Sequence, residues 1–142
     1  MKEDYSISKT LSANDTGETG GHQAGFCIPR TREILDFFPA LSTEEKNPRR
    51  SMHFLDDFDR TWSFNFIYYN NKFFGGTRNE YRLTGVTGYV RSVALRSGDK
   101  ITLTRTKDSE LMITHSKEKE YALGENGRIK LKLGAGWKVI SL

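Results

Sequence analysis

The stretch WSFNFIYYNNKFFGGTRNEYRLT, residues 62–84, joins the clearest β-strand of the chain to a long polar run. Over residues 62–69 an aromatic side chain stands at every second position, which is the period of a strand with one buried face. Such a stripe is more typical of a core than of a surface on which bases stack, so we expect these side chains to face the interior: Trp62, Phe64, Phe66 and Tyr68. Residues 70–82 break the alternation with glycines and polar side chains, and a further strand is expected at residues 81–83.

A second polar run, SANDTGETGGHQ at residues 12–23, has Ala13 as its one ordinary apolar side chain. It lies between two expected strands, residues 5–11 and residues 24–28. Its polarity places it outside the core. A hairpin needs only a few residues, so a connection this long and structureless is typical of either disorder or function.

The rest of the chain indicates short strands separated by turns. Two short helices are expected: residues 30–38, where Ile34, Leu35 and Phe38 have helical spacing, and residues 89–95. Many short strands without a regular βαβ alternation favour a mostly β fold, a partly open barrel with two short α-helices, over a doubly wound sheet. Alternation predicts the remaining strands at residues 51–55, 100–106, 110–115, 128–133 and 137–141.

The composition is that of one folded domain. The chain has 142 residues, 36% hydrophobic and 12% aromatic, and we expect a single domain over residues 1–142. The single cysteine, Cys27, excludes an internal disulfide and is interpreted as a small buried hydrophobe. Three widely spaced histidines give no zinc-ligand pattern, so no metal is expected. Because the sequence shows neither a bilayer-spanning run nor a signal peptide, we expect a cytoplasmic protein with no membrane partner.

The charge distribution indicates an anionic partner. The net charge is +4, and basic side chains gather in residues 91–107 and 128–138. Acidic side chains gather elsewhere, in residues 56–59 and around Glu118 and Glu120. Each basic cluster is consistent with a phosphate-binding face and equally with a solvated strand edge guarded by lysines. The acidic residues 56–59 are interpreted as a solvated loop.

The sequence gives little support for a catalytic site. A nuclease of the PD-(D/E)xK type needs carboxylates and a lysine around a divalent metal, but the chain has no Pro-Asp pair, and residues 118–120, EKE, have the wrong order. The glycine-rich residues 16–21 lack the lysine of a phosphate-binding loop. A triad of Ser12, His22 and Asp15 is conceivable, but no glycine pattern frames the serine.

Recognition of DNA is better supported, because the two polar runs carry the side chains that read base edges. Arginine can bond O6 and N7 of guanine, asparagine and glutamine can bond N6 and N7 of adenine, and a carboxylate can accept from N4 of cytosine. Neighbouring glycines let the backbone approach a surface closely. We therefore expect DNA contacts from residues of both runs: Ser12, Asn14, Asp15, Thr16, His22, Gln23, Lys72, Thr77, Arg78, Asn79, Glu80, Tyr81 and Arg82.

These runs occur in an order that resembles a known family. LSANDTGETGGHQAG at residues 11–25, an apolar strand that ends in Ile28 and Pro29, a short helix, and IYYNNKFFGGTRNEYRLT at residues 67–84 are together similar to the N-terminal effector domain of the EcoRII restriction endonuclease family. LRSGDKITL, residues 95–103, also resembles the turn from the second helix into a strand of that fold.

The resemblance implies a B3-like DNA-binding pseudobarrel whose two polar runs are arms that grip the major groove. We call residues 12–23 the N-arm and residues 70–82 the C-arm. The family's effector domain reads a site of the form CCWGG, where W is A or T, so a site of that kind is expected here. The resemblance also implies base contacts from four residues: His22, Arg78, Glu80 and Arg82.

The same resemblance implies what surrounds the domain. DNA binding would need no cofactor, whereas a fused C-terminal nuclease domain, absent from this chain, would use Mg²⁺ in the cytoplasm of a prokaryote. Three positions depart from the family pattern, because Gly76 and Tyr81 stand where the family has lysines and Cys27 stands where it has an aromatic residue. Loss of the two cations should weaken phosphate contacts.

Two other interpretations stay open. One is a small stand-alone metal-dependent nuclease, which Mg²⁺-dependent cleavage would reveal. The other is a single-strand or RNA binder with an open-barrel fold, which would need solvent-facing aromatic side chains on which bases stack.

Overall fold

The computed structural model describes residues 3–20, 25–118 and 136–140. Within them lie three short α-helices, α1 (Ala13–Thr16), α2 (Arg32–Leu35) and α3 (Thr87–Ser92), and the 3-10 helix η1 (Asn71–Phe74). The expected mostly β fold is confirmed, since the larger share of the elements are strands: β1 (Tyr5–Thr10), β2 (Phe26–Ile28), β3 (Arg49–Leu55), β4 (Thr61–Tyr69), β5 (Glu80–Thr84), β6 (Lys100–Arg105), β7 (Leu111–Ser116) and β8 (Trp137–Ile140).

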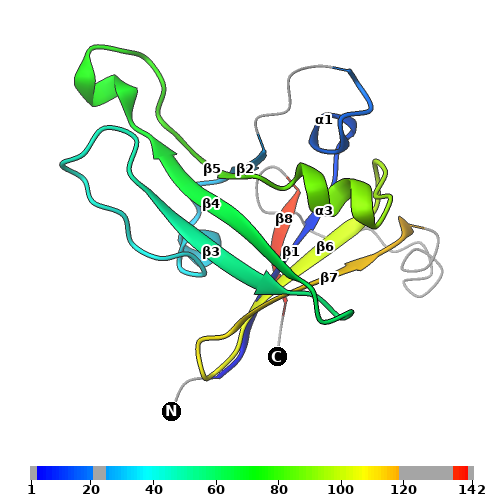
Figure 1. The fold of residues 1–142 in the computed structure, drawn as a ribbon. Helices are drawn as coiled ribbons and strands as arrows, with labels where there is room; N and C mark the ends of the chain where they lie inside the picture. Colours follow the sequence, from blue (N-terminus) through cyan, green and yellow to red (C-terminus); the bar gives the residue numbers. More distant parts are fainter. Residues whose placement is uncertain (1–2, 21–24, 119–135, 141–142) are drawn as a thin grey trace.

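The strands form one sheet in the order β2-β5-β4-β3-β7-β6-β1-β8. Neighbours run antiparallel, apart from β3 and β7, which meet in parallel at the pair Leu55 and Met112. Figure 1 shows the sheet curling into a nearly closed barrel. The edge strands β2 and β8 leave a seam, across which the Trp137 indole Nε1 donates to the Cys27 carbonyl oxygen at 2.9 Å. The expected partly open barrel is confirmed.

The barrel is filled largely by aromatic side chains. Phe64 and Phe66 are each 1% exposed, as the alternation on β4 predicts, whereas Trp62 and Tyr68 at its two ends are only partly buried. Trp137 is fully buried. The prediction of a buried Cys27 is wrong, because this residue points away from the core-facing side of the edge strand β2 and is partly exposed.

The helix predicted at residues 30–38 is shorter, because α2 covers only Arg32–Leu35, and the helix predicted at residues 89–95 is shifted, because α3 covers Thr87–Ser92. α2 ends at Leu35, because the next residues turn through bonds from the amides of Phe37 and Phe38 to carbonyls three residues back. Those two rings still pack into the core. α3 ends at Ser92, and a positive φ of 52° at Ala94 breaks the helical path. The strand predicted at residues 128–133 lies outside the described residues.

The interpretation of residues 56–59 as a solvated loop is wrong for Asp56, because this residue is only 2% exposed. Its carboxylate accepts hydrogen bonds from the indole Nε1 of Trp62 at 2.8 Å and from Arg60 Nε at 3.0 Å, and also from two backbone amides of the loop. Burial alone would raise the pKa of Asp56, but these hydrogen bonds outweigh it and lower the pKa to about 2. Asp56 therefore holds the β3–β4 hairpin together.

Candidate nucleic-acid interface

Both arms leave the same end of the barrel, shown at the top of Figure 1, whereas the β6–β7 hairpin lies at the bottom. The arms join where Gly25, just after the N-arm, lies against β5. Gly25 has φ of 86°, and a Cβ atom there would lie 2.3 Å from the Leu83 carbonyl oxygen. Arg82 Nη1 donates to the Gly25 carbonyl oxygen at 3.3 Å. Glycine is thus required where the two arms meet.

The first part of the N-arm is an ordered helical turn, which corrects the expectation of a run without structure. Ser12 caps α1: its hydroxyl accepts from the Asp15 amide at 3.2 Å, and the Asp15 carboxylate accepts from the Ser12 amide at 2.9 Å. Asp15 is only 6% exposed, and its Oδ2 lies 3.2 Å from Lys9 Nζ on β1. The carboxylate therefore fastens the N-arm to the barrel, and in this conformation it faces the protein.

The end of α1 is tied to the turn before β6. The Glu18 carboxylate accepts from Arg96 Nε at 3.2 Å and from the Ser97 amide at 2.6 Å. Hydrogen bonds from Thr16 and from Ser97 lower the pKa of Glu18. Asn14, by contrast, has an exposed side chain on α1. Of the N-arm residues predicted to contact DNA, Ser12, Asp15 and Thr16 thus also hold the arm together, and His22 and Gln23 lie outside the described residues.

The C-arm is the compact connection between β4 and β5. At its base the buried Asn70 donates to the Glu45 carbonyl oxygen at 2.7 Å and accepts from the Asn47 amide at 2.7 Å. η1 is followed by Gly75, whose φ is 89°. The Gly76 amide then donates back to the Asn71 carbonyl oxygen at 2.8 Å. A Cβ at Gly76 would lie 2.8 Å from the Cβ of Asn71. This close approach explains why a lysine at this position would not fit without a shift.

A stack of aromatic rings runs from the core into the C-arm. Phe38 stacks on Phe66 with centroids 4.5 Å apart, and Tyr81 lies between Phe66 at 5.5 Å and Tyr68 at 4.3 Å. The Tyr68 hydroxyl donates to Asn79 Oδ1. Burial, together with Tyr68, raises the pKa of Tyr81. The second departure from the family pattern therefore replaces a cation with a ring that stiffens the arm.

Three charged side chains lie in a row on the returning limb of the C-arm. Glu80 Oε1 accepts from Nε and Nη2 of Arg78 at 2.9 and 2.7 Å, and Glu80 Oε2 lies 3.4 Å from Arg82 Nη2. The Arg78 guanidinium also lies 3.8 Å from the centroid of the Tyr69 ring. Burial opposes ionisation of Glu80, but hydrogen bonds from Arg78 and the charge of Arg82 outweigh it and lower the pKa of Glu80. The anionic carboxylate thus orients both arginines.

The C-arm residues predicted to contact DNA divide by exposure. Lys72, Thr77 and Arg78 are exposed, and the Lys72 amide donates to the Arg78 carbonyl oxygen at 2.8 Å, so the two limbs of the arm are connected. The other four are partly buried: Asn79, Glu80, Tyr81 and Arg82. The structure therefore brings the predicted residues of this arm together, with Arg78 as the exposed side chain held by the most partners.

The basic cluster at residues 91–107 extends along the barrel. β6 runs antiparallel to β1, so Lys100 pairs with Thr10 beside the N-arm, whereas Arg105 pairs with Tyr5, five residues away along β1. Arg105 donates to two carbonyl oxygens that follow α2, at 2.6 and 3.0 Å. Arg105 is therefore already bonded within the protein, and the role of the cluster as a phosphate-binding face stays a prediction. The second basic cluster lies mostly outside the described residues.

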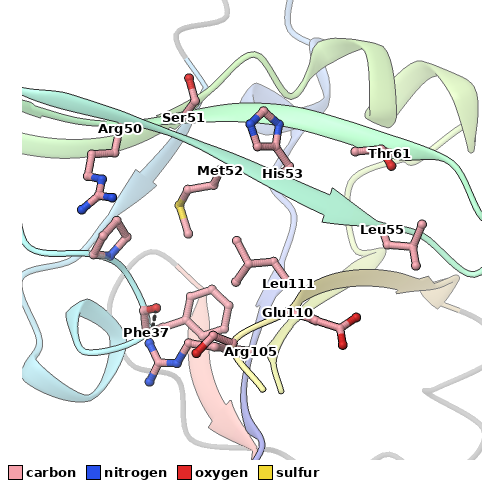
Figure 2. A pocket seen from close by; sticks show the side chains of 12 residues that line it. Phe37, Arg50, Ser51, Met52, His53, Leu55, Thr61, Arg105, Glu110 and Leu111 are labelled. Carbon is pink, nitrogen blue, oxygen red and sulfur yellow. Dashed lines mark hydrogen bonds between the residues drawn. The ribbon is translucent and has the colours of Figure 1, made fainter. Parts of the chain in front are cut away.

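Two hollows of the described surface could hold a ligand by their size. One of about 470 Å³ lies at the base of the N-arm beside the seam, between Asp15, Cys27 and Arg82. Another of about 710 Å³, shown in Figure 2, lies where β3 and β7 pair at a single position, and no motif of the sequence indicates it. Its lining mixes apolar side chains with charged ones: Phe37, Met52 and Leu111 face one another in Figure 2, and Arg50, Arg105 and Glu110 also line it. Neither hollow contains a catalytic constellation.

The described residues contain no group of three or more His, Cys, Asp or Glu side chains placed to hold a metal ion. In the same part of the chain, no helix has the length and apolar character needed to cross a membrane.

Comparison of the sequence with known families and proteins gives consistent matches. The family described as "Restriction endonuclease EcoRII, N-terminal" matches residues 1–115. The type II restriction enzyme EcoRII of Escherichia coli is 45% identical over 83 residues, which cover 54% of this chain and 19% of the enzyme. Auxin response factor 5 of Arabidopsis thaliana is 33% identical over 105 residues, 74% of this chain and 10% of that protein. The chain thus spans only a small part of these relatives.

Solved structures show the same fold. The Arabidopsis FUS3-DNA complex superposes with a TM-score of 0.59 at 20% identity, covering 78% of this chain and 94% of that one. A hypothetical protein of Arabidopsis thaliana superposes with a TM-score of 0.52 at 13% identity, covering 82% and 96%. The family match extends over both arms and most of the barrel, and the fold agrees with it. The chain therefore belongs to the family of the N-terminal domain of restriction endonuclease EcoRII, and it is a DNA-binding effector domain of the B3-like type.

Proposed function

We propose that this domain recognises a specific double-stranded DNA site of the CCWGG form by placing both arms in the major groove. The observation that carries the proposal is Arg78, exposed on the C-arm and held on one side by Glu80 and Tyr69. The C-arm connects the antiparallel strands β4 and β5 through the 3-10 helix η1, so it projects from the end of a two-stranded pair. The major groove, about 12 Å wide, is wide enough to admit two antiparallel strands.

Arg78 has the geometry of a guanine reader. Glu80 takes hydrogen bonds from Nε and Nη2, which leaves the edge formed by Nη1 and the second hydrogen of Nη2 for O6 and N7 of a guanine. Contact with the Tyr69 ring fixes the plane of the guanidinium. Because the side chain is oriented before DNA arrives, binding costs little of its conformational entropy.

Glu80 and Arg82 act in this proposal as positioning residues as well as predicted base contacts. Glu80 holds both arginines, and Arg82 connects the C-arm to the Gly25 carbonyl oxygen at the end of the N-arm. The spacing between the arms is then set by one hydrogen-bonded chain. The exposed Lys72 is placed to neutralise a phosphate and so to contribute affinity without sequence preference.

The N-arm completes the site. We propose that the exposed Asn14 bonds an adenine edge or a phosphate, and that His22 and Gln23 add base contacts, as the family resemblance implies. Ser12, Asp15 and Thr16 act through the shape of α1, to which their side chains are already bonded.

We further propose that in the complete protein this domain, formed by residues 1–142, controls a C-terminal nuclease domain that uses Mg²⁺ in a prokaryotic cytoplasm. This rests on the similarity to the EcoRII enzyme, of which the matched region is 19%. DNA binding itself needs no cofactor in this scheme. Cleavage of a CCWGG plasmid by the full-length protein, with and without Mg²⁺, tests the nuclease part.

The proposal is tested by gel shift at fixed salt with three probes: a CCWGG duplex, the same duplex with one G·C pair reversed, and the single strand. We expect the intact duplex to bind about a thousandfold or more tightly than non-specific DNA. Equal binding of all three probes would refute site-specific duplex recognition. Preferential binding of the single strand would favour the open-barrel interpretation instead.

A further inference from the structure

The tip of the C-arm carries two exposed aromatic side chains that neither the core nor the proposed guanine contact uses. Phe73 is 66% exposed and Phe74 44% exposed, both on η1. Leaving a ring in water forgoes the free energy of burying it. Such exposure, on an arm otherwise stiffened by hydrogen bonds and ring stacking, indicates a surface that is covered when the domain is bound.

The tip is held in a fixed relation to Arg78. The Phe73 amide donates to the Asn70 carbonyl oxygen at 3.0 Å, and the amide of the preceding Lys72 donates to the Arg78 carbonyl oxygen at 2.8 Å. Asn70 is itself buried and bonded to the loop before β3. The segment that carries Phe73 is therefore joined through its backbone to Arg78, and the two residues approach DNA together.

The charge around the tip matches a nucleic acid. Residues 70–79, NNKFFGGTRN, contain two basic side chains and no acidic one. An apolar side chain on a cationic arm that lies in the major groove meets one apolar base-edge group there, the C5-methyl of thymine. Apolar wedges that pry base steps apart act from the minor groove, whereas the proposed function places the C-arm in the major groove.

We propose that Phe73 packs on the C5-methyl group of a thymine in the major groove, and so reads an A·T pair next to the guanine contacted by Arg78. This inference rests on the proposed function, because it requires the C-arm to lie in the major groove. It assigns to the tip a source of specificity that hydrogen bonding does not supply.

The test removes the methyl group from the DNA. Binding of the domain to a fluorescein-labelled duplex with a central CCTGG site is measured by anisotropy, with thymine and then with deoxyuridine in the site and its flanks, one strand at a time. Wild-type protein should bind one uracil duplex about fourfold more weakly, since burying a methylene-sized group contributes roughly 0.8 kcal/mol and 1.4 kcal/mol is a factor of ten. Phe73→Ala should abolish this thymine-to-uracil difference.

Phe58→Ala is the matched control. Phe58 is 65% exposed, close to the exposure of Phe73, but it lies in the turn before β4, whereas Phe73 follows the other end of that strand. A strand of nine residues spans roughly 26 Å at about 3.3 Å per residue. The Phe58→Ala domain should keep the wild-type ratio of thymine to uracil affinities.

Each outcome decides the inference. Equal affinity of wild-type protein for thymine and uracil duplexes overturns it, even though specific binding of CCTGG persists. A Phe73→Ala domain that weakens both duplexes alike shows a wedge or general contact and also overturns it. If Phe73→Ala leaves the affinity for both the thymine and the uracil duplex at the wild-type value, the ring does not contribute to DNA binding, and the inference is overturned. If wild-type protein fails to prefer the specific duplex at all, the proposed function fails first, and the inference fails with it.

Discussion

Replacing Arg78 tests the proposed reading mechanism most directly. Arg78→Ala removes a side chain that donates two hydrogen bonds to Glu80 and that, in the proposed function, offers its remaining edge to a guanine. A bidentate arginine–guanine contact contributes about 1–3 kcal/mol of discrimination, which corresponds to roughly 5- to 140-fold. We therefore expect the affinity for the specific duplex to fall by that factor and the preference for G·C at one position to disappear.

The fold should survive the change. The ion pair with Glu80 is partly exposed, and such a pair contributes about 0.2–1 kcal/mol. Loss of the contact with Tyr69 adds roughly 0.5–1 kcal/mol. At about 2–4 °C per kcal/mol for a domain of this size, the melting temperature should fall by only a few degrees. Circular dichroism on the same preparation checks this.

Arg78→Lys separates charge from geometry. Lysine keeps the positive charge but lacks the planar fork that can bond Glu80 and guanine together. The dependence of affinity on salt should then stay near that of the wild type, while discrimination at the affected base pair falls. The assay is anisotropy over a panel of duplexes in which each base pair is replaced in turn. Unchanged discrimination at every position for both variants would refute the role of Arg78.

The remaining predictions concern pH and the bases of the arms. The pKa of Glu80 is lowered in the folded domain, so its contribution to stability is present above the ordinary value of 4.5 and is lost as the pH falls through the lowered pKa. Binding of the specific duplex should be insensitive to Glu80 ionisation near pH 7, and a Glu80→Gln domain should discriminate less well there. Gly25→Ala should destabilise the domain by more than about 1 kcal/mol, because the added Cβ would meet the Leu83 carbonyl oxygen and because φ at this residue is positive. Urea unfolding measures the loss of stability, and an unchanged unfolding midpoint would contradict the prediction. Asp15→Ala removes the carboxylate that accepts from the Ser12 amide and pairs with the buried Lys9, so we expect a loss of about 3 kcal/mol in the free energy of unfolding. A loss below about 0.5 kcal/mol would count against the buried pair.

Local patterns were enough to locate the barrel strands and both arms. The period-two alternation on β4 predicted which residues face the core, because a strand exposes and buries successive side chains whatever its neighbours are. The glycine-rich runs were recognised as arms for a similar reason, since their polarity excludes them from a core. The helix ends were less predictable, because the turn bonds after α2 and the positive φ at Ala94 depend on how the chain continues.

The roles of individual polar residues depended on partners far away in sequence. Asp15 was read as an outward-facing contact, yet it lies against Lys9 on β1 and is buried. Arg105 belongs to the same basic cluster as Lys100, yet the antiparallel register of β6 and β1 places these two residues at opposite ends of β1. Neither outcome has a local signal, because it is set by strand pairing and not by composition.

The sequence by itself therefore determined the fold class, the family and the place of the two arms along the chain, because alternation, glycine content and motif order are properties of short segments. Only the tertiary structure decided which arm side chains are bonded within the protein and which are exposed. Tyr81 can stiffen the C-arm because Phe66 and Tyr68 lie on the neighbouring strand β4, and Arg82 can reach the Gly25 carbonyl oxygen because β2 pairs with β5. These contacts are made by strand pairing, which the order of residues along the chain does not contain.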